Sequence, residues 1–403
     1  MSMSDPLLNQ TAGLPEPAGA VAPLRRDDFD RDVWCLMGLA VDAVDITRAV
    51  AAIDDAVRTR RQLSFVTPNV NFLVRAMKDE GARRDILNAD LSLADGAPLV
   101  AMAKMLGVPV PSRVAGSDLF EALRRRPAFA GRRLKVFFFG GRPGAAEAAF
   151  EAINREKGGV EAVGWHNPGF GDVESMSSDE VIAKINATEA DFVMVALGAA
   201  KGQAWIERNK DRLTAPVTAH LGAVVDFTAG GVARAPEWMR RSGLEWLWRI
   251  KEEPSLWRRY FDDGAALAGL ALRGLLPQAG RTRAAPGAAE AETVLTPSET
   301  LIRLSGQLGS GALKPVREAF RAAAARGRPV RLDLSGVETA DCAFLGQVLM
   351  LEKHLARSSA TISLAGANRR LESLFRANRM NYARAAAGER ANDEAPGMRQ
   401  AAL

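Results

Sequence analysis

The sequence contains little cysteine and little histidine. Among its 403 residues there are two cysteines, Cys35 and Cys342, and three histidines. Two cysteines that lie so far apart in the sequence indicate neither a disulfide framework nor a cysteine-rich metal site. The sequence therefore gives no reason to expect a small fold held together by disulfides or by a structural zinc ion.

A secretory leader and a membrane-spanning run are also missing. Residues 1–28 are rich in Pro, Ala and Gly and lack the charged start and apolar core of a signal peptide, so we expect a flexible leader there. The apolar run Ala265–Leu276 is shorter than the roughly 18 residues that a membrane helix needs, and Arg273 interrupts it. These features favour a cytoplasmic protein.

What the chain does have is the composition of a globular protein with more than one domain. Hydrophobic residues make up 47% of the chain and charged residues 25%, which is enough to build a core. Lys and Arg total 53 against 48 Asp and Glu, so the overall charge does not indicate a nucleic-acid partner, and we expect none. At this length, two domains with separate cores are the natural expectation.

Composition divides the chain into two folded units. Residues 277–297 have the Pro, Ala and Gly content of a linker, so we expect one unit over 29–276, a second over 298–385 and a flexible tail over 386–403. In the first unit, short apolar runs alternate with longer helical patterns. This rhythm predicts an α/β fold with a Rossmann-like, mostly parallel sheet and helices on both faces. The expected strands are 63–66, 91–94, 134–139, 160–163, 192–196 and 217–221.

Polar side chains follow the first two of these strands. A Thr-Pro-Asn motif supplies Thr67 and Asn69, and an Asp-Gly turn supplies Asp95. Because a βαβ unit brings both strand ends to one edge of the sheet, we expect these side chains to lie close together. Taken alone, Thr and Asn are ordinary helix caps and Asp-Gly is an ordinary turn. The cluster Arg-Val-Ala-Gly-Ser-Asp at 113–118, which offers an arginine to an anion, favours a binding site instead.

The order and spacing of these motifs resemble the WecG/TagA/CpsF family of glycosyltransferases over about residues 33–262. Members of that family transfer a sugar from a UDP donor to a lipid diphosphate-linked acceptor during assembly of wall or surface polysaccharides. The resemblance implies that Asp95 is the catalytic base and that Arg113 contacts an anionic group. It also implies that Thr67 and Asn69 shape the acceptor and donor pocket.

The resemblance predicts an inverting transferase that uses a UDP-sugar. The sugar would be of the N-acetylmannosamine, N-acetylmannosaminuronic acid or glucuronic acid type, and the acceptor a polyprenyl diphosphate-linked sugar in surface or exopolysaccharide biosynthesis. The acceptor hydroxyl loses its proton as it attacks the anomeric carbon, and a carboxylate can accept that proton. Basic side chains and backbone amides can stabilise the leaving diphosphate, and we expect the chain to offer no Asp-x-Asp motif of the kind that many metal-dependent transferases use. We therefore expect no metal ion and no other cofactor.

Two other classes of protein are alternatives to a transferase. A non-catalytic nucleotide-sugar sensor or scaffold that signals through the second unit is compatible with the same motifs. A nicotinamide-dependent dehydrogenase requires a dinucleotide-binding glycine fingerprint after the first strand, and Thr-Pro-Asn stands in that place.

A glycine loop is the first candidate for binding the donor. Gly140 and Gly141 follow the strand 134–139 and precede a helix. A strand, a glycine loop and a helix N-terminus together accept phosphate oxygens on backbone amides. We assign this loop to the uridine diphosphate of the donor.

The segment 197–205 is the second candidate. It contains Ala-Lys-Gly-Gln, where the resembling family more often has Pro-Lys-Gln-Glu. The polar side chain expected at position 202 is therefore absent, so either Gln203 substitutes for it or the donor preference differs. Lys201 is a candidate contact to a phosphate or a carboxylate, although a lysine at the start of a helix is often simply exposed.

Residues 234–261 are basic and rich in tryptophan. They hold four of the seven tryptophans and seven Lys or Arg against four Glu. This combination is typical of helices that bind anionic membrane surfaces, although aromatic side chains packed onto the sheet would give the same pattern. The resemblance implies that the segment 234–276 engages an anionic membrane, which predicts a peripheral protein on the inner face of the cytoplasmic membrane. It also implies that arginines of this segment close over the site, namely Arg234, Arg249, Arg258 and Arg259.

The second unit has a different resemblance. Its segment 332–346 resembles the STAS domains of anti-sigma-factor antagonists, in which an Asp-Ser at the start of a helix carries the regulatory phosphorylation site. Cys342 stands in place of that serine, so a constitutive docking role with a protein partner is favoured over a phosphorylation switch. The thiol itself is either an inert buried group or a redox sensor with a lowered pKa.

Overall fold

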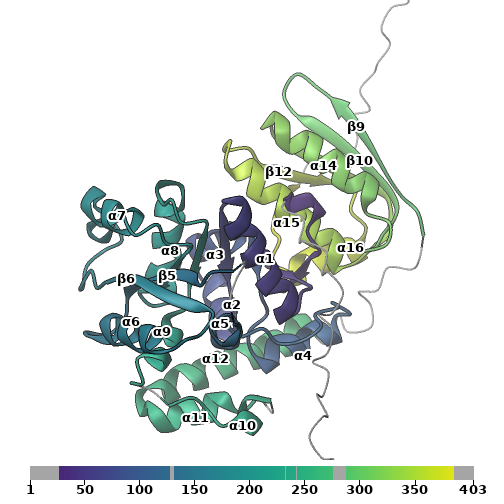
Figure 1. The fold of residues 1–403 in the computed structure, drawn as a ribbon. Helices are drawn as coiled ribbons and strands as arrows, with labels where there is room; N and C mark the ends of the chain where they lie inside the picture. Colours follow the sequence, from purple (N-terminus) through teal and green to yellow (C-terminus); the bar gives the residue numbers. More distant parts are fainter. Residues whose placement is uncertain (1–26, 128–130, 232, 242, 276–286, 385–403) are drawn as a thin grey trace, which may run out of the picture.

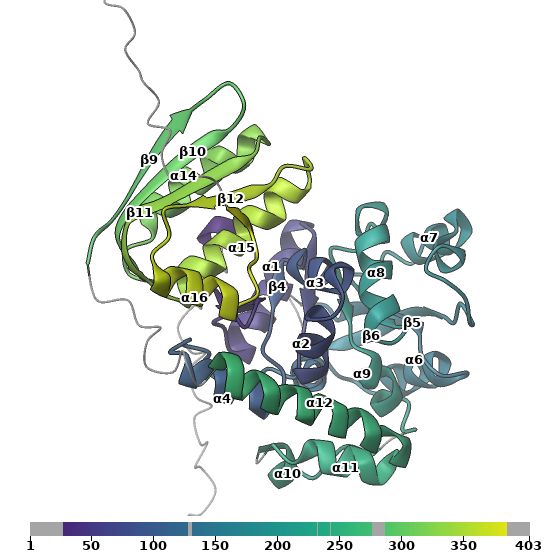
Figure 2. The same ribbon diagram turned by 180° about the vertical axis from the view of Figure 1, so that it is seen from behind.

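The computed structural model describes residues 27–127, 131–231, 233–241, 243–275 and 287–384. Two α/β units lie against each other, and three helices form a further layer along one side of the first unit (Figures 1 and 2). The predicted α/β class is therefore confirmed. Almost all of the predicted leader and the whole predicted tail beyond 385 lie outside the described residues.

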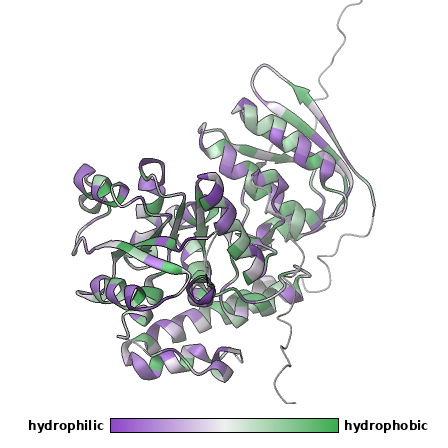
Figure 3. Cartoon of the chain, in the orientation of Figure 1, coloured by the Kyte–Doolittle hydropathy of each residue, from purple (hydrophilic) through white to green (hydrophobic). Residues whose placement is uncertain are grey.

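The first unit contains a six-stranded parallel sheet, as the alternating pattern predicts. Its strands pair in the order β4-β3-β8-β7-β5-β6, and every neighbouring pair is parallel. The strands of the sheet are mainly hydrophobic in colour, whereas the helices show both colours (Figure 3), because the strands are covered on two faces. The strands are β3 Leu63–Val66, β4 Leu91–Ser92, β5 Leu134–Gly140, β6 Val160–His166, β7 Phe192–Ala196 and β8 Val217–His220.

Helices cover both faces of this sheet. Alternate residues of each strand face opposite sides, so Phe138 packs with one set of helices and Phe137 with the other. The first set comprises α1 Ile46–Thr59, α5 Gly116–Arg125, α6 Ala145–Arg155 and α9 Gly222–Thr228. The second set comprises α2 Val70–Ala76, α3 Glu80–Leu87, α7 Asp179–Asn186 and α8 Ala199–Asn209. Short 3-10 turns occupy η1 Asp28–Asp30, η2 Ser175–Ser177 and η3 Lys210–Arg212, and α4 Ala97–Met105 follows the end of β4.

The basic, tryptophan-rich segment forms several helices and not one continuous amphipathic helix. Gly243, with a φ of 77°, separates the first two helices, and a β-carbon there would lie 2.6 Å from the side chain of Ala97. The third helix lies beside α2, where the Asn71 amide donates to the carboxylate of Asp263 at 3.2 Å. The helices are α10 Glu237–Arg241, α11 Glu245–Glu252 and α12 Trp257–Leu270, with η4 Pro254–Leu256 between the last two and η5 Ala271–Leu275 after them.

The second unit is a five-stranded sheet with helices on one face, in the strand order β13-β12-β11-β10-β9. Its first strand, β9 Ala289–Leu295, lies inside the predicted linker 277–297, so that linker boundary is wrong. This edge strand is mostly exposed, and its alternation is carried by the small residues Ala289 and Ala291 and not by large apolar side chains. Such a pattern is typical of linker composition. The other elements are β10 Thr300–Leu308, α14 Lys314–Arg326, β11 Val330–Ala340, α15 Cys342–Ala356, β12 Ile362–Ala365, α16 Arg369–Ala377 and β13 Ala383–Arg384.

One hydrophobic cluster runs through both units, so the second unit has no core separate from the first, whereas two further clusters belong to the first unit alone. Helix α15 packs between its own sheet and a hairpin of the first unit, formed by β1 Val33–Leu36 and β2 Leu39–Asp42. A β-carbon on Gly346 would lie 2.3 Å from the carbonyl oxygen of Val33, so glycine allows the helix and the strand backbone to touch. Cys342 is 1% exposed at the start of α15, and burial raises its thiol pKa, which favours the inert interpretation of this cysteine over the redox sensor.

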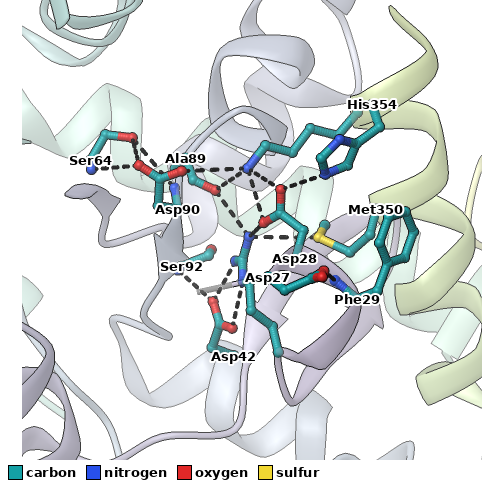
Figure 4. Close-up of polar contacts among 12 residues, drawn as sticks. Asp27, Asp28, Phe29, Asp42, Ser64, Ala89, Asp90, Ser92, Met350 and His354 are labelled. Atoms are coloured by element: carbon teal, nitrogen blue, oxygen red, sulfur yellow. Dashed lines mark hydrogen bonds and ion pairs between the residues drawn. The ribbon is translucent and has the colours of Figure 1, made fainter. Parts of the chain in front are cut away.

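A buried ionic network joins the same surfaces (Figure 4). Asp28, placed by the sequence at the end of a flexible leader, is buried and forms ion pairs with Arg31 at 2.7 Å and with Lys353 of α15 at 3.0 Å. Burial opposes the ionisation of Asp28, but the hydrogen bond from His354 and the charges of Arg31 and Lys353 outweigh it and lower the pKa. Asp28 therefore belongs to the folded unit and not to the predicted leader 1–28, because its carboxylate neutralises two buried cations.

Candidate active site

The strand ends bring three of the predicted residues together. The Asp95 amide donates to the carbonyl oxygen of Pro68 at 2.9 Å, which ties the ends of β4 and β3 to each other. Thr67 is buried beside Gly116, where a β-carbon would lie 3.4 Å from its hydroxyl. Asn69 caps α2 by accepting hydrogen bonds from two backbone amides, so its oxygen has the structural use that a capping residue commonly has. The contacts of Thr67 and Asn69 with a substrate stay predictions.

Asp95 lies in surroundings that suit a base near neutral pH. Burial raises its pKa to about 7, and Arg113 opposes this rise. The carboxylates of Glu245 and Asp118 add to the rise, whereas Arg249 again opposes it. A carboxyl group whose pKa lies near the working pH can accept a proton and later release it.

Asp118 organises the cations around Asp95. It accepts hydrogen bonds from Arg113 at 2.7 Å, from Arg234 at 2.6 Å and from Arg240 at 2.9 Å. Arg113 also donates to Glu245 of α11 at 2.9 Å. Helices α10 and α11 are thus fixed over the strand-end edge by ion pairs with the cluster 113–118 that the sequence singles out.

Arg234 and Arg249 retain donor capacity at this edge. Their guanidinium groups lie 6.0 and 5.7 Å from the centroid of the Phe227 ring. The Nε atom of each is buried and has no hydrogen-bond partner among the described residues. Two partly paired arginines beside a carboxylate provide sites for an anionic ligand, which agrees with the position that the sequence predicts for both.

The other two arginines of the prediction lie elsewhere. Arg258 and Arg259 are exposed on α12 and lie over the rings of their own neighbours, Trp257 and Tyr260. The described contacts do not connect either of them to Asp95. A contact of these two arginines with a substrate stays a prediction.

The donor-binding residues expected on α8 point away from a common site. Gln203 is 3% exposed and donates to the carbonyl oxygen of Asp85 in α3 at 3.2 Å, so it does not substitute for a side chain at position 202. Lys201 is exposed and donates to the carbonyl oxygen of Gly171 at 2.7 Å. The Gln203 side chain points to α3 and not to where a side chain at position 202 would point, because adjacent residues of a helix face different directions.

The glycine loop lies where the sequence predicts it, at the end of β5, but one of its backbone amides donates a hydrogen bond within the protein. Gly140 and Gly141 end β5 with φ of 91° and 95°, and a β-carbon on Gly140 would lie 2.7 Å from the carbonyl oxygen of Ala196. The Gly141 amide donates to that same oxygen at 2.7 Å. Phosphate binding by this loop stays a prediction, and the Gly141 amide is already engaged within the sheet.

A cavity of about 550 Å³ opens next to Asp95, between α4 and α10. Its apolar wall comes from Ala97, Val100 and Ala101, and Lys104 and Arg240 supply positive charge. Apolar surface beside cations suits an amphiphilic ligand with an anionic group. Arg113 and Asp118 line both this cavity and the surroundings of Asp95.

No group of three or more metal-ligating side chains occurs in the part of the chain that the structure describes. The Asp-x-Asp pattern does occur near the start of the chain, at residues 28–30 and 30–32. There, Asp28 pairs with Arg31 and Lys353, and Asp30 pairs with Arg321 at 3.0 Å. These carboxylates neutralise cations at the contact between the two units and do not lie at the strand-end edge.

Comparison with known proteins agrees with this geometry. The model of the Glycosyl transferase WecG/TagA/CpsF family matches residues 34–281, and the model described as Mlab, STAS domain matches residues 292–382. A parallel sheet with a half-buried carboxylate and arginines at its carboxyl edge thus belongs here to a glycosyltransferase. The chain is a member of the WecG/TagA/CpsF family, and it carries a STAS domain after the transferase unit.

Two relatives share the name N-acetylglucosaminyldiphosphoundecaprenol N-acetyl-beta-D-mannosaminyltransferase. The protein from Bacillus spizizenii (strain ATCC 23059 / NRRL B-14472 / W23) is 31% identical over 222 residues, which are 54% of this chain and 84% of the relative. The protein from Bacillus subtilis (strain 168) is 28% identical over 198 residues, 49% of this chain and 73% of the relative. A GTP-binding protein from Sulfolobus solfataricus in complex with GDP is 9% identical, covers 63% of this chain and 93% of its own, and has a TM-score of 0.18, too low to support any argument.

Sequence reasoning missed the acidic partners of the site and one histidine. Glu245 and Asp118 orient Arg113, and His220 ends β8 at the same edge of the sheet. Asp118 is the last residue of the cluster 113–118. Its pairing with arginines could have been inferred, because the nearby arginines need a negative charge. Glu245 could not be found in this way, because α11 reaches the site only through the tertiary fold. Among the described residues, no helix is long and apolar enough to cross a membrane.

Proposed function

We propose that the chain transfers a sugar from a UDP donor to a polyprenyl diphosphate-linked acceptor, with inversion at the anomeric carbon and with Asp95 as the base. The observation that supports this most strongly is the carboxyl group of Asp95, with a pKa raised to about 7, close to Asp118 and its ion pairs with Arg234, which precedes α10, and with Arg240 of α10. The names of the two relatives support a lipid diphosphate-linked acceptor and a sugar of the N-acetylmannosamine type. N-Acetylmannosaminuronic acid and glucuronic acid are the other donor sugars that we consider, in surface or exopolysaccharide biosynthesis.

In the proposed reaction, a carboxylate oxygen of Asp95 accepts the proton of the acceptor hydroxyl. The hydroxyl oxygen forms a bond to the anomeric carbon of the donor, and the bond from that carbon to the diphosphate oxygen breaks. UDP leaves with the electron pair. Arg234 and Arg249 stabilise its negative charge through their unpaired Nε donors.

The cavity between α4 and α10 is the proposed acceptor site. Lys104 and Arg240 would bind the acceptor diphosphate, and the apolar face of α4 would contact the start of the lipid chain. Exposed aromatic residues of the segment 234–276 support peripheral attachment to the inner face of an anionic membrane, since aromatic and basic side chains suit the membrane interface. They are Trp238, Trp246, Trp257 and Phe261.

The proposal is tested by screening UDP-sugars for UDP release in the presence of a short-chain lipid diphosphate acceptor and EDTA. We expect release with one of the three sugar types and no dependence on metal, because cationic side chains take the place of a metal ion. Asp95→Asn should lower the transfer rate by about 10²- to 10⁴-fold and leave UDP binding unchanged. Undiminished transfer by this variant would refute Asp95 as the base, and activity that EDTA abolishes and magnesium restores would refute metal independence.

A further inference from the structure

His220 has an unusual position at the carboxyl edge of the sheet. It ends β8 in register with Val195 of β7, on the face that α8 covers. A β-carbon at Gly202 of α8 would lie 2.1 Å from Cδ2 of the imidazole and 3.0 Å from Nε2. The ring therefore fills the space that any side chain at position 202 would occupy.

The imidazole also has unused hydrogen-bonding capacity. Its Nε2 atom is buried and has no hydrogen-bond partner among the described residues. Burial lowers the pKa of His220 to about 4, and the charge of Arg75 in α2 adds to this effect, so the ring is neutral at pH 7. A buried polar atom without a partner costs free energy unless a ligand completes its hydrogen bond.

The strand order gives that ligand a place. Asp95 follows β4 and the glycine loop follows β5, and the end of β8 lies between them in the order β4-β3-β8-β7-β5. Neighbouring strands are about 4.8 Å apart. A UDP-sugar that lies along this edge, with its uridine near Gly140 and its anomeric carbon facing Asp95, carries its diphosphate and the sugar joined to it across the end of β8. A neutral imidazole suits a sugar hydroxyl better than a phosphate.

We propose that His220 binds the sugar of the donor through Nε2 and that Gly202 is glycine because it must admit this ring. This inference rests on the proposed use of a UDP-sugar. It explains the departure of the segment 197–205 from the Pro-Lys-Gln-Glu pattern of the resembling family: the polar group comes from β8 in place of α8. His220 is therefore a specificity-determining residue of the donor site.

The experiment compares the affinities of UDP, UDP-N-acetylmannosamine, UDP-N-acetylglucosamine and UDP-glucuronic acid by calorimetry, in the whole chain and in single variants. His220→Ala should weaken the preferred UDP-sugar by about 3- to 10-fold, as expected for one lost hydrogen bond, and should leave the affinity for UDP unchanged. Gly202→Ala should have the same selective effect, since its methyl group displaces the ring. His220→Asn, which keeps a polar group, should alter the ranking of the sugars.

His166→Ala is the matched control. His166 ends the edge strand β6, three strands away from β8, where it stacks on Phe139 and lies 3.4 Å from the ammonium group of Lys184, so its removal should leave all four affinities unchanged. Unchanged sugar affinities in both His220→Ala and Gly202→Ala would overturn the inference, and so would an equal loss of affinity for UDP. If the unaltered chain binds none of the UDP-sugars, the proposed function itself fails, and that result is distinct from either of the others.

Discussion

Asp95 is an acid whose ionisation is set by competing neighbours. Burial and two carboxylates favour its protonated form, and Arg113 and Arg249 favour the ionised form. The outcome is a pKa of about 7, which is high for an aspartate. A base of this kind is active only when it is ionised, so its neighbours control the pH range in which the proton can be accepted.

The rate of sugar transfer should therefore fall as the pH drops below about 7, because Asp95 becomes protonated. Arg113→Gln removes a charge that lowers this pKa, so the midpoint of the acid limb should move to higher pH. The measurement is kcat against pH with saturating donor and acceptor. Arg132→Gln is the matched control, since Arg132 pairs with Asp191 at the opposite edge of the sheet and should leave the midpoint in place. A midpoint that does not move in Arg113→Gln would contradict this account of Asp95.

At the scale of elements, the helices of the segment 234–276 lie in two different places. Helices α10 and α11 bring Arg240 and Glu245 onto the strand-end edge, where both form ion pairs with residues of the cluster 113–118. Helix α12 lies beside α2 and presents Trp257 and Phe261 to the surface, 52% and 69% exposed. One stretch of sequence thus supplies both charged side chains at the site and exposed aromatic side chains on α12.

Replacement of both Trp246 and Trp257 by alanine should weaken binding to vesicles of phosphatidylcholine and phosphatidylglycerol by about tenfold or more, because buried aromatic surface is lost. Flotation of the vesicles measures the bound fraction. Added salt should weaken binding of the unaltered chain, since the basic side chains contact anionic lipid. Phe170→Ala is the control, because Phe170 is 97% exposed in the loop after β6, outside this segment. Equal binding by the double variant and the unaltered chain would exclude these tryptophans as the anchor.

At the scale of the whole molecule, the STAS domain is part of the transferase fold. Helix α15, where the resembling domains carry their regulatory serine, is buried against β1 and β2 of the first unit. Lys353 of the same helix lies within the network of Asp28, Arg31 and Asp42, and Asp42 accepts a hydrogen bond at 2.7 Å from the amide of Ser92 in β4. The chain's own transferase unit covers this face of the domain, and docking of a separate protein partner stays a prediction.

The chain should therefore unfold in a single thermal transition that includes both units. Gly346→Ala should lower stability by about 1–3 kcal/mol, because its methyl group would meet the backbone of β1 at Val33. Calorimetry of the two chains measures this difference. Gly311→Ala is the control, since a β-carbon there meets no atom within 4 Å. Two well-separated transitions in the unaltered chain would show that the units fold independently.

Local patterns in the sequence were sufficient to predict the six-stranded sheet and to bring Asp95 and Arg113 to one edge of it. Apolar runs separated by helical segments predict six strands at nearly their observed positions, since burial on both faces requires continuous apolar sequence. The motifs at Asp95 and Arg113 are predicted to share one edge because parallel strands must end together. The sequence does not reveal β9, because alanine and not a large apolar residue occupies its alternate positions 289 and 291. Nor does it reveal the break of residues 234–261 into separate helices.

The sequence by itself determined the class of fold, the strand-end position of Asp95 and the family of the chain, because these depend on local periodicity and on motifs of fixed spacing. Only the tertiary structure decided which distant charges meet. It directs Gln203 toward α3, places His220 against Gly202 and joins the STAS domain to the transferase unit through one core. These outcomes depend on how helices far apart in the sequence pack onto one sheet, and local sequence does not record those long-range contacts.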